Sequence, residues 1–277
     1  MGLRKIALPT LHKKGDQIIP AFRDLHPFDI VEVAIDTDSF GTFSGEVERQ
    51  LTPRDAAIAK ARLAIEETGW SGAIASEGSI GADPYLPLLI TDREVMVFID
   101  VEEGVIIEEN YRSFDIIAAK MEYRPGDDLS KFLREADFPN HHLIVRGVRE
   151  GQVVAIKGID DEEKLNSALR EISILNEEEK LIIESDLRAH ASPSRQRNIA
   201  TLALILAKRV ANRCPDCECA GWGRVDHEFG VECIECSHKD MRIARRVMDG
   251  CSRCGLRKPG QILRESIEPG ECELCNP

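Results

Sequence analysis

Four Cys-x-x-Cys pairs lie close together near the end of the 277-residue chain. The pairs are Cys214/Cys217, Cys233/Cys236, Cys251/Cys254 and Cys272/Cys275. Two residues between cysteines make a tight knuckle that aims both thiolates at one ion, and four thiolates complete a closed tetrahedral zinc site. The spacing therefore predicts two structural Zn²⁺ sites, each built from two knuckles, in a small double zinc-ribbon domain.

The partners of the four knuckles stay open. Fifteen residues separate the first knuckle from the second, and seventeen separate the third from the fourth, so the simplest pairing joins sequence neighbours. A crossed pairing is the alternative. Disulfides would need an oxidising compartment, and the apolar part of the N-terminus is too short for a signal peptide. Cys219, His227 and His238 are spare potential ligands, which we expect to be packing or surface residues.

Composition limits the classes of protein to consider. The formal charge of −13 argues against a protein that coats nucleic acid nonspecifically, because phosphate binding needs a surplus of Lys and Arg. No apolar run approaches the ~20 residues that a membrane helix needs. We expect a cytoplasmic protein with an α/β domain over residues 1–212 and the zinc-ribbon domain over residues 213–277.

Strands and helices alternate through the first 210 residues, which indicates a mixed α/β domain. One helix opens at Thr52-Pro53 and stops at Gly69. Further helices are predicted over residues 18–25, 129–136, 162–174 and 194–210. Strands are predicted over residues 5–9, 28–35, 71–75, 88–90, 94–100, 104–111, 142–146, 153–157 and 181–184.

Charged residues suited to phosphate chemistry occur around the second of these helices. Asp55 begins that helix, Lys60 lies further along it, and Glu77 is expected in a glycine-containing turn directly after the next strand. Two carboxylates can hold Mg²⁺ while the ion bridges phosphates, and a lysine neutralises phosphate charge. Alternatively, Asp55 only complements the helix dipole, Lys60 is solvated and Glu77 is an ordinary turn residue.

This region resembles the central motif of the inosine/xanthosine triphosphate pyrophosphatase family. The resemblance covers Asp55–Arg62, Thr68-Gly69 and Ala73–Ser79. The segment Ala7–Lys14 is similar to the family's opening phosphate loop, in which Thr or Ser is followed by Asn and Lys. His12 stands where that family has Asn.

The resemblance implies a fold and a set of roles. The fold would be a long mixed sheet with flanking helices and a cleft between two lobes, over roughly residues 1–210. Asp55 and Glu77 would hold Mg²⁺ or activate water. Lys14 and Lys60 would bind the triphosphate and Thr10 would help to position it. His12 of the same loop is a further candidate substrate-binding residue. The complete layout with its zinc-ribbon tail also resembles a bacterial family of unknown function.

A second group of candidate residues precedes the last helix. Arg188 and His190 follow the strand that ends at Glu184, and Ser192-Pro193 is a plausible helix start. Because a helix N-terminus offers free N–H groups to anions, Arg188, His190 and Arg195 are candidate substrate-binding residues. A capped helix with a surface Asp–Arg pair is the alternative. We expect His141 and His142 to be packing or surface residues.

Two functions remain as hypotheses. The first is an Mg²⁺-dependent nucleoside triphosphate pyrophosphatase, in which water attacks a phosphate and pyrophosphate leaves. The second is a nonhydrolysing nucleotide- or RNA-binding protein that uses its zinc ribbons to dock a protein or RNA partner. A zinc tail that serves only self-association is a further alternative.

Overall fold

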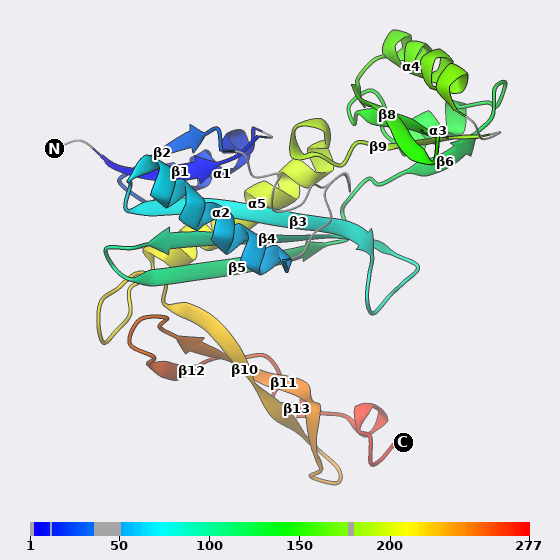
Figure 1. The fold of residues 1–277 in the computed structure, drawn as a ribbon. Coiled ribbons are helices and arrows are strands. Elements are labelled where there is room, and N and C mark those ends of the chain that lie inside the picture. Colours follow the sequence, from blue (N-terminus) through cyan, green and yellow to red (C-terminus); the bar gives the residue numbers. More distant parts are fainter. Residues whose placement is uncertain (1–2, 12, 36–50, 177–179) are drawn as a thin grey trace.

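The computed structural model describes residues 3–11, 13–35, 51–176 and 180–277. Three β-sheets and five α-helices occur in these residues, which confirms the mixed α/β class. Figure 1 shows two α/β bodies side by side and a long strand pair that extends away from the larger body. None of the described helices is long and apolar enough to cross a membrane.

The first sheet has the strand order β2-β1-β3-β4-β5. Its strands are β1 (Arg4–Pro9), β2 (Phe28–Val33), β3 (Gly72–Ala82), β4 (Ile90–Asp100) and β5 (Val105–Ser113). The first three run parallel, whereas β3, β4 and β5 form an antiparallel meander. Ala7 pairs with Ala73, so this parallel register brings the end of β1 at Pro9 beside Ala75. β3 therefore continues past the carboxyl end of β1.

Helices cover both faces of the first sheet (Figure 1). α2 (Pro53–Thr68) packs on one face through four buried alanines, whose small side chains allow close contact with the strands. It begins and ends where the sequence predicts: the Thr52 side chain accepts the Asp55 N–H, and Gly69 takes a left-handed φ of 67°. α1 (Gly15–Arg23) and α5 (Pro193–Ala211) cover the other face.

The second sheet has the order β6-β9-β7-β8 and its own hydrophobic core. Its strands are β6 (Lys120–Tyr123), β7 (Leu143–Arg149), β8 (Gln152–Ile159) and β9 (Leu181–Ser185). The core also includes residues of α3 (Ser130–Glu135) and α4 (Glu162–Leu175). The chain enters this sheet after β5 and returns from β9 through a short 3₁₀ turn (Ala189–Ala191) to α5.

The third sheet contains the strands that follow α5. Its order is β12-β11-β10-β13, with β10 (Gly223–Cys233), β11 (Lys239–Gly250), β12 (Arg257–Ile262) and β13 (Ser266–Ile267). A 3₁₀ turn over Pro269–Glu271 leads to the last knuckle. β10 and β11 pair as a long antiparallel hairpin.

Two predicted elements differ from the structure. β3 does not stop at residue 75 but pairs continuously with β4 as far as Ala82, so the expected turn around Glu77 is wrong. The strand predicted over 88–90 is present only at Ile90, where β4 begins. In both places, pairing across the β3–β4 hairpin overrides the local turn signal of Gly78 and Gly81. β6 was not predicted from the sequence.

Candidate functional site

Eight cysteines gather in two clusters of four. The inner cluster is Cys214, Cys217, Cys251 and Cys254, and the outer cluster is Cys233, Cys236, Cys272 and Cys275. Within each cluster the four sulfurs lie within 4.8 Å of one another, and all nine cysteines of the chain are free of disulfides. Each cluster can hold one zinc ion, which confirms two sites with two knuckles each.

The simplest pairing of the knuckles is wrong, and the crossed alternative is right. The first knuckle joins the third and the second joins the fourth. The length of β10 explains this, because its eleven residues span about 36 Å and separate the knuckles at its two ends. Gly223 pairs with Gly250, which brings the knuckle before β10 beside the knuckle after β11.

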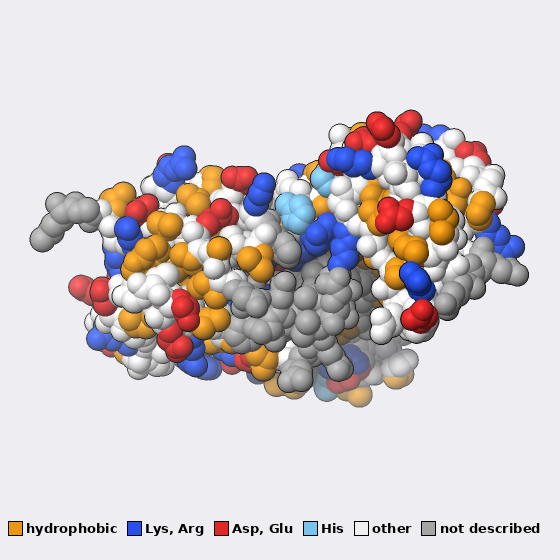
Figure 2. Space-filling model, turned by 45° about the horizontal axis from the view of Figure 1, so that its top comes forward, with side chains coloured by type: hydrophobic (Ala, Val, Ile, Leu, Met, Phe, Trp, Pro, Cys, Tyr) orange, Lys and Arg blue, Asp and Glu red, His pale blue; other side chains and the backbone are white. Residues whose placement is uncertain are grey.

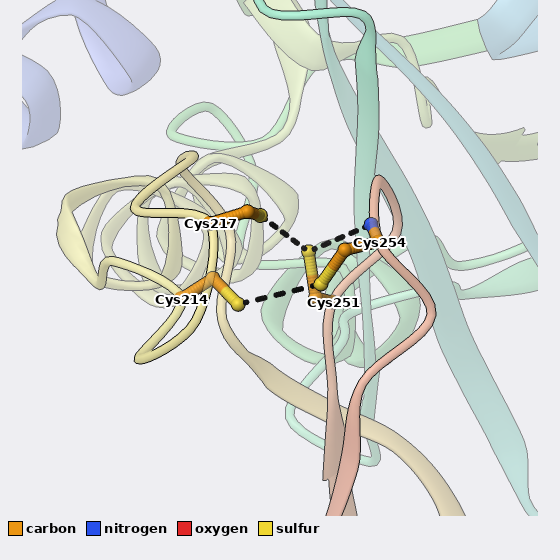
Figure 3. A group of neighbouring side chains, drawn as sticks. All are labelled: Cys214, Cys217, Cys251 and Cys254. Atoms are coloured by element: carbon orange, nitrogen blue, oxygen red, sulfur yellow. Dashed lines mark hydrogen bonds between the residues drawn. The ribbon is translucent and has the colours of Figure 1, made fainter.

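The inner cluster has the spacing of a tetrahedral thiolate site (Figure 3). Two of its S–S distances are 3.7 Å (Cys214 to Cys254) and 3.6 Å (Cys217 to Cys251). Zn–S bonds of about 2.3 Å place tetrahedral ligands about 3.8 Å apart. Burial alone would raise the pKa of Cys251, but N–H groups of Cys254 and Arg253 help lower it to about 6. This favours the thiolate that a metal needs.

The spare potential ligands occupy different surroundings. Cys219 is buried, with its sulfur 3.4 Å from that of Cys217 and 3.3 Å from that of Cys251, so it packs against the inner cluster as a fifth thiol. Burial raises its pKa. His238 contacts Glu273 beside the outer cluster, and His227 lines a polar cavity between β5 and β10.

Cationic residues from three elements meet beside the part of β3 that extends past β1. Lys14, at the start of α1, donates to the side chain and carbonyl of Ser76 at 3.0 and 3.3 Å. Lys60 of α2 forms an ion pair with Glu77. Burial lowers the pKa of Lys14. Four charged residues also lie near enough to influence this pKa: Glu94, Arg195, Glu77 and Lys60. Thr10 lies in the same loop and its hydroxyl contacts the Lys14 N–H.

The two carboxylates of this group lie on opposite faces of the sheet. Glu77 points to the α2 face, where it meets Lys60, and Glu94 points to the α5 face, where it meets Arg195 at 2.6 Å. Glu94 pairs in register with Gly78 of β3. A Cβ on Gly78 would lie 2.3 Å from the Glu94 carboxylate and 2.4 Å from the Arg195 guanidinium, so only glycine leaves room for this ion pair.

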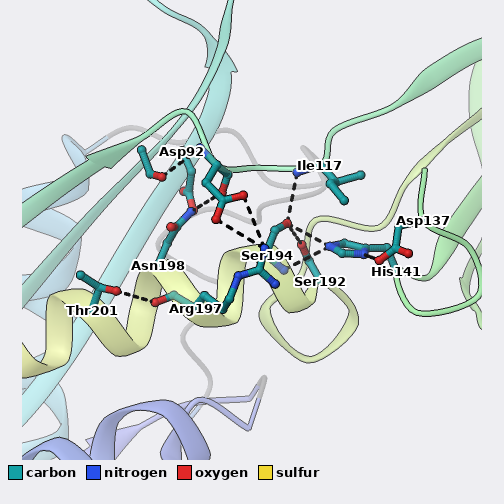
Figure 4. Close-up of polar contacts among 11 residues, drawn as sticks. Asp92, Ile117, Asp137, His141, Ser192, Ser194, Arg197, Asn198 and Thr201 are labelled. Atoms are coloured by element: carbon teal, nitrogen blue, oxygen red, sulfur yellow. Dashed lines mark hydrogen bonds and ion pairs between the residues drawn. The ribbon is translucent and has the colours of Figure 1, made fainter. Parts of the chain in front are cut away.

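Asp92 adds a third acidic group on the α5 face. It is fully buried, and Asn198 of α5 donates to it at 2.9 Å (Figure 4). Burial, and then the nearby Glu94, raises the pKa of Asp92 to about 7. Sequence reasoning missed Asp92 and Glu94, although they share a strand face with the buried Met96 and Phe98. Acidic residues on an apolar face were the available signal.

The structure places Asp55 away from the paired Lys60 and Glu77. Its carboxylate accepts from the Thr52 hydroxyl at 2.7 Å and contacts Arg54 at 3.4 Å, and it is exposed at the start of α2. Five residues along a helix correspond to a rotation of about 140°, so Asp55 and Lys60 face different directions. Its role in metal binding stays a prediction. His12 lies outside the described residues.

Arg188 and His190 lie on the return from the second sheet to α5. Arg188 donates to Asp186 at 2.9 Å through Nε and forms an ion pair with it, but Asp186 is fully buried and accepts a further N–H from Gly158. The pair therefore joins a buried carboxylate to a partly exposed Arg188 and is not a pair of two surface side chains. Burial and then Arg188 lower the pKa of the exposed His190, which is also influenced by Lys13.

A cleft of about 1050 Å³ lies between the two bodies. Its apolar lining includes Ile80, Ile90 and Ile144. Its charged lining has four cations and two carboxylates: Lys120, Arg146, Lys157, Arg188, Glu184 and Asp186. Figure 2 shows Lys, Arg and His side chains at the junction of the bodies. Leu187, which also lines the cleft, accepts a hydrogen bond from Arg195 at 2.7 Å. The cationic group and the cleft are thus adjacent.

A hydrogen-bonded chain from Asp137 to Ser194 joins the two bodies at the start of α5 (Figure 4). Asp137 contacts Nδ1 of His141 at 2.9 Å, and Nε2 of His141 contacts the Ser194 hydroxyl at 3.0 Å. Ser194 is fully buried and its hydroxyl accepts the Ile117 N–H, so this serine is not placed as a nucleophile. The chain instead fixes the start of α5, and His141 is the packing residue that the sequence predicts.

Comparisons with known proteins give a family without an assigned activity. The family described as Domain of unknown function (DUF6671) matches residues 60–277. No curated protein sequence matches the chain. A competence-damaged protein (CinA) superfamily protein from Enterobacter cloacae is similar in structure, with 13% identity and a TM-score of 0.22 over 41% of this chain and 69% of that chain.

Proposed function

We propose that this chain, which belongs to the family described as Domain of unknown function (DUF6671), is an Mg²⁺-dependent hydrolase that releases pyrophosphate from a nucleoside triphosphate. One observation carries the proposal. Lys14, Lys60 and Arg195 come from three separate elements and meet with carboxylates beside β3, next to a cleft large enough for a nucleoside.

The cations suit the charge of the substrate. Lys14 and Lys60 come from the phosphate-loop and helix positions that the resemblance assigns to the triphosphate. Arg195 lies in the first turn of α5, where free N–H groups also favour anions. Cations held in a water-poor site stabilise the negative charge that develops on a phosphate during attack by water.

Glu77 is the carboxylate we assign to the reaction. It lies where β3 continues past β1, and the ion pair with Lys60 fixes its orientation. An ionised carboxylate there can accept a proton from the attacking water or hold the metal. Mg²⁺ would neutralise phosphate charge and orient the leaving pyrophosphate. The apolar lining of the cleft, including Ile80 and Ile144, would cover the base.

The first test is a pyrophosphate-release assay with zinc-loaded protein, Mg²⁺, and canonical and deaminated nucleoside triphosphates. Glu77→Gln should lower kcat by about a hundredfold or more while the melting temperature shows that the variant is folded. Glu122→Gln is the matched control, because it removes an exposed ion pair with Lys180 in the second sheet. We expect its kcat to stay within about twofold of the wild type.

Two results would contradict the proposal, the first only the role of Glu77 and the second the hydrolase itself. The first is equal turnover of Glu77→Gln and the wild type, which would remove Glu77 from the reaction. The second is a folded wild-type protein that releases no pyrophosphate from any triphosphate. Nucleotide or RNA binding without turnover would then support the nonhydrolysing alternative, with the cysteine clusters as part of a docking module.

A further inference from the structure

Two acidic residues of β4 stand on the same face of the sheet with almost no exposure. Asp92 and Glu94 are two residues apart, so their side chains point in the same direction, toward α5. Their exposed fractions are 0% and 2%. Two carboxylates this close and this buried are costly unless other groups compensate their charge.

Each carboxylate has one oxygen with a donor and one without. Asn198 donates to Oδ2 of Asp92, and Arg195 donates to Oε1 of Glu94 at 2.6 Å. Oδ1 of Asp92 and Oε2 of Glu94 are buried and have no donor among the described residues, and the two carboxyl groups lie close enough to share a proton. Buried polar atoms in native proteins are nearly always satisfied, so these two oxygens need either a proton shared between the carboxyl groups or a bound cation.

The pair lies directly behind the wall of the cleft. Asp92 pairs in register with Ile80 of β3, which lines the cleft, and the two side chains share a face of the sheet. Arg195, the partner of Glu94, also binds the carbonyl of the cleft residue Leu187. Both carboxylates are therefore linked to residues of the cleft wall, Asp92 through its strand pairing and Glu94 through Arg195.

Charge balance favours a cation at this place. Lys14, Lys60 and Arg195 supply three positive charges to the group beside β3. The carboxylates of Glu77, Glu94 and Asp92 supply three negative charges when all are ionised. A triphosphate brings further negative charge, which these cations alone cannot balance. Mg²⁺ prefers oxygen ligands and is typically held by one or two carboxylates, with phosphates and waters completing its shell.

We propose that Asp92 and Glu94 form a divalent-cation site for Mg²⁺ at the wall of the cleft, separate from the two cysteine clusters. The site deepens the proposed function and rests on it for its role, because the ion would meet the phosphates bound by Lys14 and Arg195. Glu77 lies on the opposite face of the sheet with Lys60, so it is not a ligand of this site.

The test measures Mn²⁺ binding by electron paramagnetic resonance, with zinc-loaded full-length protein and no nucleotide. We expect one Mn²⁺ per chain, displaced by excess Mg²⁺. Asp92→Asn should raise the Kd for Mn²⁺ about tenfold or more, because it removes one of two carboxylate ligands while its amide still bonds with Asn198. Glu94→Gln should do the same.

Asp115→Asn is the matched control. It changes an exposed carboxylate whose one ion pair within the described residues is with Arg197, at 3.5 Å. Its Kd should equal that of the wild type. Two results would overturn the site: a wild-type protein that takes up no Mn²⁺, or an Asp92→Asn variant that binds Mn²⁺ as the wild type does. The two carboxyl groups would then share a proton instead of binding a cation. Mn²⁺ uptake without pyrophosphate release would keep the site and contradict the hydrolase.

Discussion

The inner and outer cysteine clusters have the same four-thiolate ligand set in different surroundings. Cys214 and Cys251 of the inner cluster belong to the largest hydrophobic core, together with residues of α5, β4 and β5. The outer cluster lies at the far end of the β10–β11 hairpin and packs only with Val231, Ile267 and Ile243 among the described hydrophobic residues. The same set of four thiolates therefore lies against a large hydrophobic core in the inner cluster and at the end of a hairpin in the outer cluster.

The inner cluster also fixes the third sheet to the main body. Cys214 follows α5 directly, and Arg209 in the last turn of that helix donates to the Glu108 carbonyl and the Glu109 carboxylate, both at 2.9 Å. Ala220 donates to Glu103 in the turn before β5. The inner metal is thus expected to stabilise the whole protein, and the outer metal only its own hairpin end.

The largest effect should come from Cys251→Ser. It removes a buried ligand of the inner cluster, and structural zinc contributes about 10–16 kcal/mol of apparent binding free energy. We expect the loss of one zinc ion per chain and a fall in melting temperature of more than about 10 °C. Metal analysis and calorimetry measure both. Cys219→Ala, an equally buried thiol beside the same cluster, should keep two zinc ions per chain.

A Cys251→Ser variant that lost one zinc ion and kept the wild-type melting temperature would show that the inner metal does not stabilise the whole protein. In that case the inner cluster would be attached to the main core without supporting it. A Cys219→Ala variant with one zinc ion would instead show that the fifth thiol is a ligand.

Cys272→Ser should have a smaller effect, confined to the hairpin end. It removes a buried ligand of the outer cluster, so one zinc ion is lost and the last residues become sensitive to protease. The main melting temperature should stay within about 2 °C of the wild type, because few contacts link this end to the core. A fall as large as that of Cys251→Ser would show that the two clusters stabilise one unit.

The smallest effect concerns the pH at which each cluster releases zinc. N–H groups help lower the pKa of one thiol in each cluster, Cys233 and Cys251, so both clusters hold a thiolate that protons can displace from zinc. The outer cluster has two exposed cysteines, Cys236 and Cys275, whereas the inner cluster has one, Cys254, so acid reaches the outer sulfurs more easily. As the pH falls from 8 to 5, the outer zinc should leave first. A dye that binds released zinc follows the two steps. Cys272→Ser serves as the reference, because it has lost the outer zinc and releases only the inner one.

Local features of the sequence were sufficient for the elements that local forces form. A Cys-x-x-Cys knuckle needs only two intervening residues, and α2 carries its own start at Thr52-Pro53 and stop at Gly69. Ser192-Pro193 likewise predicted the start of α5, which begins at Pro193. The sequence by itself thus determined that the chain has an α/β fold and two four-cysteine sites.

Only the tertiary structure decided which of these parts meet. The knuckle pairs are crossed because β10 is long enough to separate sequence neighbours. Glu77 lies within a strand because β4 continues the pairing past the glycines. The contacts of Asp92 with Asn198, and of Glu94 with Arg195, join residues about a hundred positions apart. Such contacts depend on how sheets and helices pack, which no local pattern of residues contains.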